Sequence, residues 1–159
     1  MTPRRHQPPH ATHPHPHTHT RAGLTVLEVV AVLAVLSIVA GIALPLANRA
    51  ADRIAVQSAI TAVASACALA RSIAIMRGTY ATIRLASAPA RVLVTSGTDT
   101  LLARRLDGDG RPITLSATRT TVTYSPIGLG YGAANSQVIA RRGSAADTLW
   151  TSRLGRVRH

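Results

Sequence analysis

The chain has 159 residues, of which 47% are hydrophobic and only 3% aromatic, and its formal net charge is +12. Without Phe, a core for one domain of this length must consist of Val, Ile, Leu and Ala. All 18 basic residues are Arg, whose planar, permanently charged guanidinium suits carboxylate and phosphate partners. A single cysteine, Cys67, excludes an internal disulfide and a CxxC metal pair.

Residues 1–23 are polar, rich in Pro, and hold every His except His159. A segment of this composition cannot bury a core, so we predict a disordered leader that is later removed. The alternating His and Pro residues of positions 13–19 offer imidazoles that suit Ni, Cu or Zn. A soluble low-complexity leader accounts for the same pattern, and we predict neither a metal site nor a cofactor.

Residues 24–46 are almost entirely apolar and contain one carboxylate, Glu28. About 20 consecutive apolar residues are enough to cross a bilayer as a helix. A carboxylate within such a span costs about 2.5–3.5 kcal/mol, so its presence indicates a specific role. We therefore predict a transmembrane helix that Pro45 kinks or loosens.

Apolar residues then recur at steps of three and four along residues 47–78, in the order Val56, Ile60, Val63, Cys67, Ala70 and Ala74. This spacing predicts an amphipathic helix that continues the transmembrane span as its soluble half. Arg77 and Gly78 form a helix-stop signal, so the whole helix is expected to cover residues 24–77.

Residues 79–159 change to a strand-like pattern separated by Gly and Asp clusters. The predicted strands are residues 80–85, 90–95, 113–115, 121–124, 137–140 and 148–151. One long helix followed only by strands predicts an α+β fold in which the helix packs on an antiparallel β-sheet.

Few residues of the chain could carry out catalysis. His159 is the single His outside the leader, Lys is absent, and the single Glu lies in the apolar span. No Ser-His-Asp or Cys-His site can be built from such a set, so we predict that the protein is not an enzyme. The segment 107–110, Asp-Gly-Asp-Gly, is similar to the start of a calcium loop, but Thr118 stands where an EF-hand needs Glu. We interpret this segment as a β-turn.

The run Gly23-Leu24-Thr25-Val26-Leu27-Glu28 resembles the cleavage and methylation motif of type IV prepilins and type II secretion pseudopilins. A secretory signal peptide, the alternative, has a shorter apolar core with its cleavage site behind it. The resemblance implies that prepilin peptidase cuts after Gly23 and methylates Leu24. It also implies that Glu28 neutralises a neighbouring subunit's N-terminal amine and that Pro45 loosens the helix. Leu24 stands where Phe is usual in this family.

The segments Tyr124–Gly130 and Leu154–Arg158 resemble the Pro-x-Gly turn and closing Gly-Arg strand of the H-type minor pseudopilin (GspH/FimT-like) family. This resemblance implies a single-pass inner-membrane protein with residues 79–159 as a β-rich periplasmic domain. The implied partners are the inner membrane, prepilin peptidase, and other pilins or pseudopilins, contacted through the N-terminal helix.

Two functions remain open within this family. The first is a minor pseudopilin that helps to move secreted proteins through a type II secretion system. The second is a FimT-like minor pilin that binds DNA through a flexible, Arg-rich tail, with the candidate residues Arg141, Arg142, Arg153, Arg156 and Arg158. After the leader, 15 Arg and six acidic residues leave a charge of +9, which favours an anionic partner. The scarcity of aromatic residues for base stacking argues against DNA. A membrane-anchored solute-binding or enzymatic domain is a third class.

Overall fold

The computed structural model describes residues 23, 25–107, 110–132, 135–154 and 156–158. One helix, α1 (Val26–Arg77), is followed by strands β1 (Ala81–Ser87), β2 (Ala90–Ser96), β3 (Asp99–Arg105), β4 (Thr114–Ala117), β5 (Thr121–Tyr124), β6 (Gly130–Tyr131), β7 (Ser136–Arg142), β8 (Ala145–Thr151) and β9 (Val157–Arg158). This order confirms the predicted α+β class. The chain divides after Val39 into two compact units, and the second, Ala40–His159, contains all of the strands. The His-rich leader and Leu24 lie outside the described residues.

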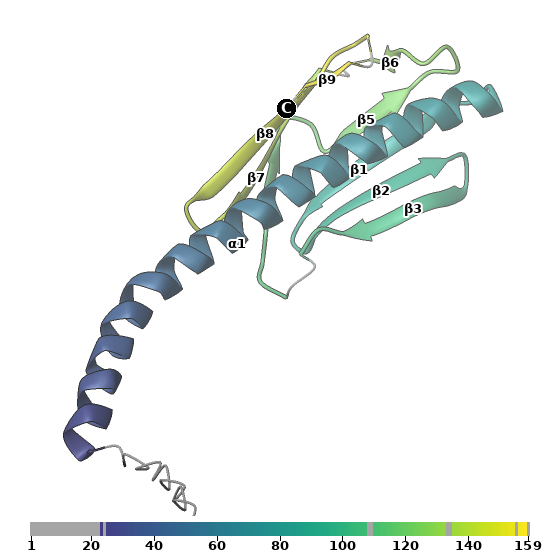
Figure 1. Cartoon of the computed structure of the whole chain (residues 1–159). Coiled ribbons are helices and arrows are strands. Elements are labelled where there is room, and N and C mark those ends of the chain that lie inside the picture. Colours follow the sequence, from purple (N-terminus) through teal and green to yellow (C-terminus); the bar gives the residue numbers. More distant parts are fainter. Residues whose placement is uncertain (1–22, 24, 108–109, 133–134, 155, 159) are drawn as a thin grey trace, which may run out of the picture. The chain divides into compact units, whose positions relative to one another are not determined.

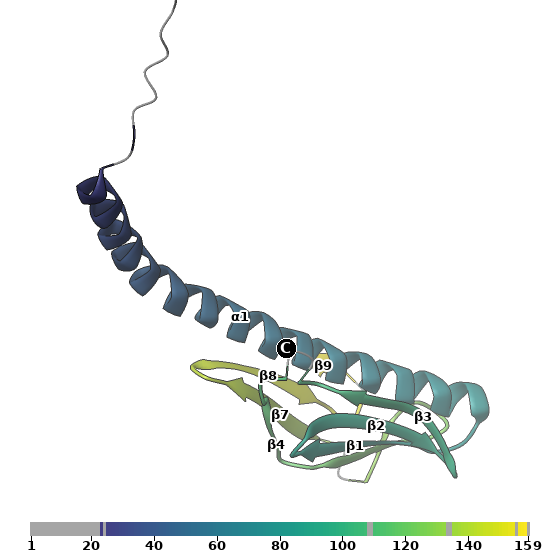
Figure 2. The same cartoon turned by 90° about the horizontal axis from the view of Figure 1, so that it is seen from below.

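The strands form two antiparallel sheets in the second unit. The five-stranded sheet has the order β3-β2-β1-β5-β6, and the four-stranded sheet has the order β4-β7-β8-β9. The part of α1 that belongs to this unit lies across one side of both sheets (Figures 1 and 2).

The buried face of α1 is the one that the sequence predicts. All six residues of the predicted stripe, from Val56 to Ala74, are buried. They pack in one cluster with apolar side chains from both sheets, among them Ile83, Val94, Val138 and Leu149. Because the helix contributes many Ala residues to this cluster, the sheets can approach it closely without large side chains.

Helix α1 ends at the predicted stop. Gly78 has φ +60° and donates to Ile75 O at 3.3 Å, and Thr79 donates to Ala74 O at 3.2 Å. This pair of bonds is the Schellman arrangement, in which a glycine in the left-handed region closes a helix. Pro45 lies inside α1 without ending it, although a proline has no N–H to donate to the preceding turn.

Most of the strands in the domain were predicted, but two were missed. β3 and β6 were not predicted. β3 is an edge strand with five exposed residues out of seven, so it has little of the alternation that marks a half-buried strand. β6 has only two residues, which is too few for a periodic pattern.

Candidate functional site

A capping residue just before α1 fixes the backbone of Glu28 in the first helical turn. The backbone N–H of Glu28 donates to the Thr25 hydroxyl at 3.2 Å, and the Val29 N–H donates to the Thr25 carbonyl at 3.1 Å. Thr25 is thus the N-cap residue, and Glu28 occupies the third helical position, as in a capping box. A carboxylate here lies beside the positive end of the helix dipole, which stabilises its negative charge.

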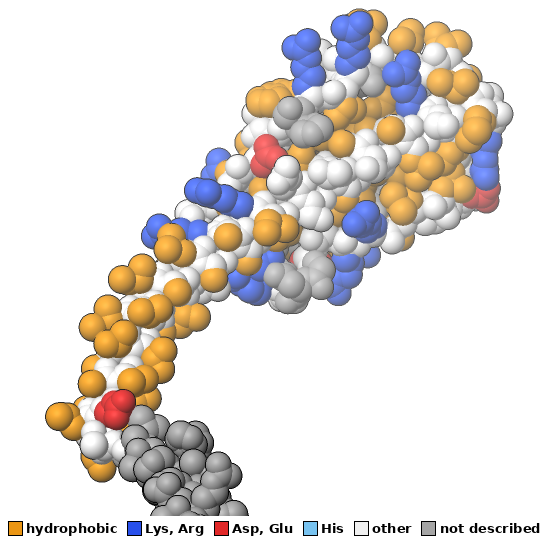
Figure 3. Space-filling model, in the orientation of Figure 1, with side chains coloured by type: hydrophobic (Ala, Val, Ile, Leu, Met, Phe, Trp, Pro, Cys, Tyr) orange, Lys and Arg blue, Asp and Glu red, His pale blue; other side chains and the backbone are white. Residues whose placement is uncertain are grey.

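Nothing in the described part of the chain covers the apolar half of α1. Its large side chains are exposed from Val26 to Leu46, with Leu27 at 79% and Leu44 at 64%. By length and composition this part of the helix is able to cross a membrane. Figure 3 shows hydrophobic side chains along this part of the helix, with an acidic side chain near its start. Such a surface requires lipid or other helices around it.

A buried ion pair fixes the start of the packed part of α1 to the sheet. Asp52 Oδ1 lies 3.0 Å from Arg142 Nε and 3.0 Å from Arg111 Nη1. Asp52 and Arg142 are only 6% and 4% exposed. Gly143, with φ +56°, lies so close that a Cβ there would be 2.6 Å from Asp52 Oδ2. The β7–β8 turn is therefore held against the helix by a charged contact as well as by apolar packing.

This ion pair reduces the number of candidate arginines that can bind a ligand. Arg141 and Arg142 were both proposed as DNA contacts, but they point to opposite faces of β7. Arg141 is exposed, whereas Arg142 is buried in the pair with Asp52. We therefore leave Arg142 out of the candidate surface. The alternation of β7, which buries Val138, Ala140 and Arg142, is the signal that could have shown this.

The end of the chain is folded back rather than free. Val157 and Arg158 form β9, which pairs with Thr151 and Trp150 of β8. Ser152 donates to Arg156 O at 2.9 Å and accepts through its hydroxyl from Arg156 N at 3.2 Å. The predicted flexible tail is therefore wrong for this segment, and the predicted closing strand is confirmed. Gly155 and His159 lie outside the described residues.

The C-terminal hairpin forms a shallow hollow of about 290 Å³ lined by Trp150, Thr151, Ser152, Leu154, Arg156 and Arg158. Trp150 and Arg158 are register partners, so their side chains leave the same face of the sheet. Arg153, Arg156 and Arg158 are all exposed. The hairpin thus combines one half-exposed indole with guanidinium groups.

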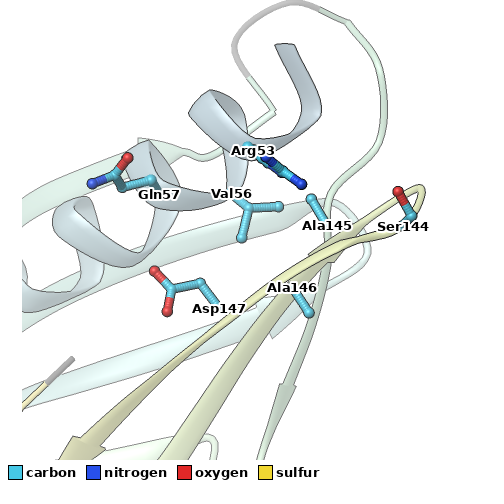
Figure 4. Close-up of a pocket in the computed structure, with 7 residues that line it drawn as sticks. All are labelled: Arg53, Val56, Gln57, Ser144, Ala145, Ala146 and Asp147. Carbon is cyan, nitrogen blue, oxygen red and sulfur yellow. The ribbon is translucent and has the colours of Figure 1, made fainter. Parts of the chain in front are cut away.

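Further hollows lie beside α1, and two of them are shared with β8 or β9. One, of about 430 Å³, is lined by Ala64, Ala68, Arg71, Ser72, Ile75 and Val157. The other, of about 330 Å³, lies where Arg53, Val56 and Gln57 of α1 face Ser144 of the β7–β8 turn and residues 145–147 of β8 (Figure 4). The Asp147 carboxylate that lines it accepts from the N–H of Thr148 at 2.7 Å.

Cys67 and Tyr124 meet inside the core. Burial raises the pKa of the Cys67 thiol to about 11, and hydrogen bonding with Tyr124 opposes part of that rise. Burial, and next the neighbouring Cys67, raise the pKa of Tyr124 above its usual value. A neutral thiol in this position serves packing rather than nucleophilic chemistry. The prediction that the protein is not an enzyme stays a prediction.

No group of three His, Cys, Asp or Glu residues suited to a metal ion occurs among the described residues. The segment proposed as a β-turn shows a bond from the Gly110 N–H to the Asp107 carbonyl, at 3.4 Å, which spans four residues as a turn does. Asp109 lies outside the described residues. The carboxylate of Asp107 is already held by Arg105.

Comparisons with known proteins agree with this architecture. The sequence profile of the family described as "Type II transport protein GspH" matches residues 59–155. Two crystal forms of the type IV minor pilin FimU from Pseudomonas aeruginosa are similar in fold. The first has a TM-score of 0.55 and 14% identity, with 65% of this chain and 86% of that chain covered. The second has a TM-score of 0.52 and 17% identity, with 64% and 90% covered. No curated protein sequence matches.

Family and fold together indicate a minor pilin or pseudopilin, a type of protein that contacts other pilins in a filament. The exposed apolar half of α1 is compatible with a membrane anchor. The profile match covers more than half of the chain, including most of the packed part of α1 and every strand except β9. The chain therefore belongs to the type II transport protein GspH family.

Proposed function

We propose that the protein is a minor pseudopilin of a type II secretion pseudopilus. The observation that carries this proposal is the family match over residues 59–155, whose description names type II transport. In this proposal residues 24–46 anchor the chain in the inner membrane and the β-rich domain faces the periplasm. Prepilin peptidase first removes residues 1–23 and methylates Leu24.

The physical basis of assembly is the exposed half of α1. Its apolar side chains are stable in lipid, and they are equally able to pack against the same region of other subunits. Glu28 does not share this freedom, because a carboxylate in a bilayer costs about 2.5–3.5 kcal/mol without a partner. The N-terminal amine released at Leu24 has the same need. Pairing between these two charges in neighbouring subunits would offset both costs and set the subunit register.

Processing is tested at Gly23. A Cβ at Gly23 would meet no atom within 4 Å, so Gly23→Val should leave the fold unchanged while blocking the peptidase. Intact mass measurement of the membrane fraction should show the mature chain, starting at methylated Leu24, for the wild type and the full precursor for Gly23→Val. Gly41→Val is the matched control, because Gly41 is also open on the helix surface. If the wild-type protein in the membrane fraction still carries residues 1–23, the proposal is overturned.

Assembly is tested at Glu28. We expect Glu28→Gln to be processed normally but to enter cross-linked complexes with other pseudopilins poorly, since the amide cannot neutralise an amine. Ser37→Ala is the control: the Ser37 hydroxyl donates only to the Leu33 carbonyl of its own helix, at 2.8 Å. If Glu28→Gln and Ser37→Ala assemble equally well, the charge pairing is refuted.

A second candidate function rests on the C-terminal hairpin, where Trp150 lies beside Arg156 and Arg158. A FimT-like minor pilin would use these groups, with Arg153 and Arg141, to bind DNA during uptake. Guanidinium groups bind phosphate without sequence preference, and each contact adds about −0.9 to the slope of log K against log salt. Binding of duplex DNA by the full chain in detergent, lost in Arg156→Ala/Arg158→Ala, would support this function.

The two functions are separated in the cell by deleting the gene and restoring it. A secretion subunit should leave type II substrates in the periplasm when it is absent, with DNA uptake intact. Loss of a DNA-uptake subunit should abolish DNA uptake and leave secretion intact. In that case Arg156→Ala/Arg158→Ala should also abolish uptake, whereas the same variant of a secretion subunit should still support secretion.

A further inference from the structure

Three arginines share the outer face of the five-stranded sheet, on the side away from α1. Arg91 of β2 lies directly opposite Arg105 of β3. Arg84 of β1 lies opposite Leu93, two residues along β2 from Arg91. Register partners and residues two apart project on the same face of a sheet. All three arginines are exposed, while the neighbours of Arg84 and Arg91 along their strands include the buried Ile83 and Val92.

Such a cluster is unfavourable unless anions meet it, because like charges opposite each other on adjacent strands repel. Arg105 is partly neutralised: its Nε and Nη2 donate to the two carboxylate oxygens of Asp107 at 3.1 and 2.8 Å. These bonds raise the pKa of Arg105 and hold the pKa of Asp107 below its usual value. Within the described part of the chain, no ion pair joins Arg84 or Arg91 to a carboxylate. Two guanidinium groups on this face are thus ready for an external anion.

The remainder of the outer face is formed by hydroxyl and aromatic groups. The same face carries Thr82, Thr95, Thr121 and Thr123, which are register partners in adjacent strands or oppose Arg84. Beyond them stand Tyr80 and Tyr131, whose rings meet edge to face with centroids 5.0 Å apart. The two tyrosines are 50% and 62% exposed. Tyr131 is the register partner of Thr123, which places it on this face.

This combination of groups favours a nucleic acid over a protein partner. Leu93 is the one large aliphatic residue on the outer face of β1 and β2, and it is half-buried, whereas protein interfaces usually need an apolar centre. Arg and Thr side chains donate to phosphate oxygens. Exposed aromatic rings stack with unpaired bases, and antiparallel sheets with such rings are a known platform for single strands.

We propose that the outer face of the five-stranded sheet, with Arg84, Arg91, Tyr80 and Tyr131, is a binding site for single-stranded nucleic acid. The phosphates lie against the arginines and a base stacks on the tyrosines. Arg84 and Tyr80 are four positions apart along one extended segment, about 13 Å at ~3.3 Å per residue. The site goes beyond the pseudopilin function, and it is carried by a different sheet from the C-terminal hairpin.

The test uses the full chain in detergent and a fluorescent oligothymidine of about 20 nucleotides, a length that exceeds one such site. We expect Arg84→Ala/Arg91→Ala to weaken binding at least about tenfold and to reduce the salt slope by about two phosphate contacts. Tyr131→Ala should weaken binding about tenfold with the salt slope unchanged, because stacking releases no counterions. The matched control is Arg49→Ala/Arg53→Ala, which removes the same charge from exposed positions on α1 and should change binding less than threefold.

Other outcomes overturn the inference. Equal losses in the sheet and helix variants would mean that net charge alone attracts the oligonucleotide. Loss in Arg156→Ala/Arg158→Ala with none in Arg84→Ala/Arg91→Ala would assign binding to the hairpin instead. Equal competition by poly-glutamate would indicate an acidic protein partner. Folding is checked by thermal melting: Arg91→Ala should melt no lower than the wild type, since it removes repulsion from Arg105.

Discussion

Replacing Asp52 by Asn should lower the free energy of unfolding of the β-rich domain by far more than the loss of one hydrogen bond would. The substitution keeps the shape of the side chain but removes the negative charge that faces Arg142 at 3.0 Å. Arg142 is only 4% exposed, so water hydrates it poorly while the domain stays folded. Removing one partner of a buried pair costs about 3–5 kcal/mol, because the buried charge that remains loses its opposite charge.

That cost is large for a domain of this size. Total stabilities are about 5–15 kcal/mol, and each kcal/mol lowers the melting temperature by roughly 2–8 °C over the relevant size range. We therefore expect the melting temperature to fall by at least about 6 °C for Asp52→Asn. Arg111, the second partner of Asp52, is half-exposed and can turn to solvent, so it adds little to the loss.

The assay is urea unfolding of the full chain in detergent, followed by the fluorescence of Trp150, the single tryptophan. Trp150 lies in β8, so its emission follows the domain and not the apolar half of α1. Asp99→Asn is the matched control, because Asp99 pairs with Arg77 at the same 3.0 Å but with both side chains exposed. An exposed pair contributes about 0–1 kcal/mol.

A second variant tests the cause. Asp52→Leu/Arg142→Met removes both charges, so it should be more stable than Asp52→Asn in spite of carrying one more substitution. The reasoning is refuted if Asp52→Asn loses no more stability than Asp99→Asn, or if the double variant is the least stable of the three.

Three further predictions concern the core and its turns. Gly143→Ala should cost about 1–3 kcal/mol more than Gly97→Ala; both glycines have positive φ, but only at Gly143 does a Cβ meet a carboxylate, so equal melting temperatures would contradict the structure. Ile60→Ala should cost about 2–5 kcal/mol and Ile127→Ala less than about 1, since the first is fully buried and the second 75% exposed; urea midpoints compare them. Because the pKa of Cys67 is raised to about 11 from its ordinary 9.0, stability should be constant below pH 9 and fall by up to about 2–3 kcal/mol toward pH 11. In Cys67→Ala the stability should fall by less over the same pH range. Thiol reagents should label the wild-type chain only after urea is added.

The sequence predicts the helix and its buried face well because the signal is local and repeated. Six small apolar residues at helical spacing define one stripe, and Arg77 with Gly78 defines its end. The same period also reaches Asp52, four residues before Val56, which places a carboxylate on the buried face. That position is the sequence signal for the ion pair, but its partner could not be identified without the fold.

Surface sites were harder to predict because they depend on register between distant strands. Arg84, Arg91 and Arg105 look evenly dispersed along the chain, and only the pairing of three strands brings them to one face. Arg141 and Arg142 show the converse: they are adjacent in sequence but lie on opposite sides of β7. Arg153, Arg156 and Arg158 are exposed, and the hairpin that holds them depends on pairing with β8, which the sequence pattern did not show.

The buried ion pair also has a consequence for the time course of biogenesis. Asp52 belongs to the helix that emerges first, and Arg142 to a strand near the end of the chain. The buried face of α1 likewise waits for Val138 and Leu149. Contacts between such distant positions form late in folding and make it slow. While the C-terminal strands are still missing, the helix presents a bare apolar stripe and an unmatched carboxylate, a state that a quality-control protease or chaperone can recognise.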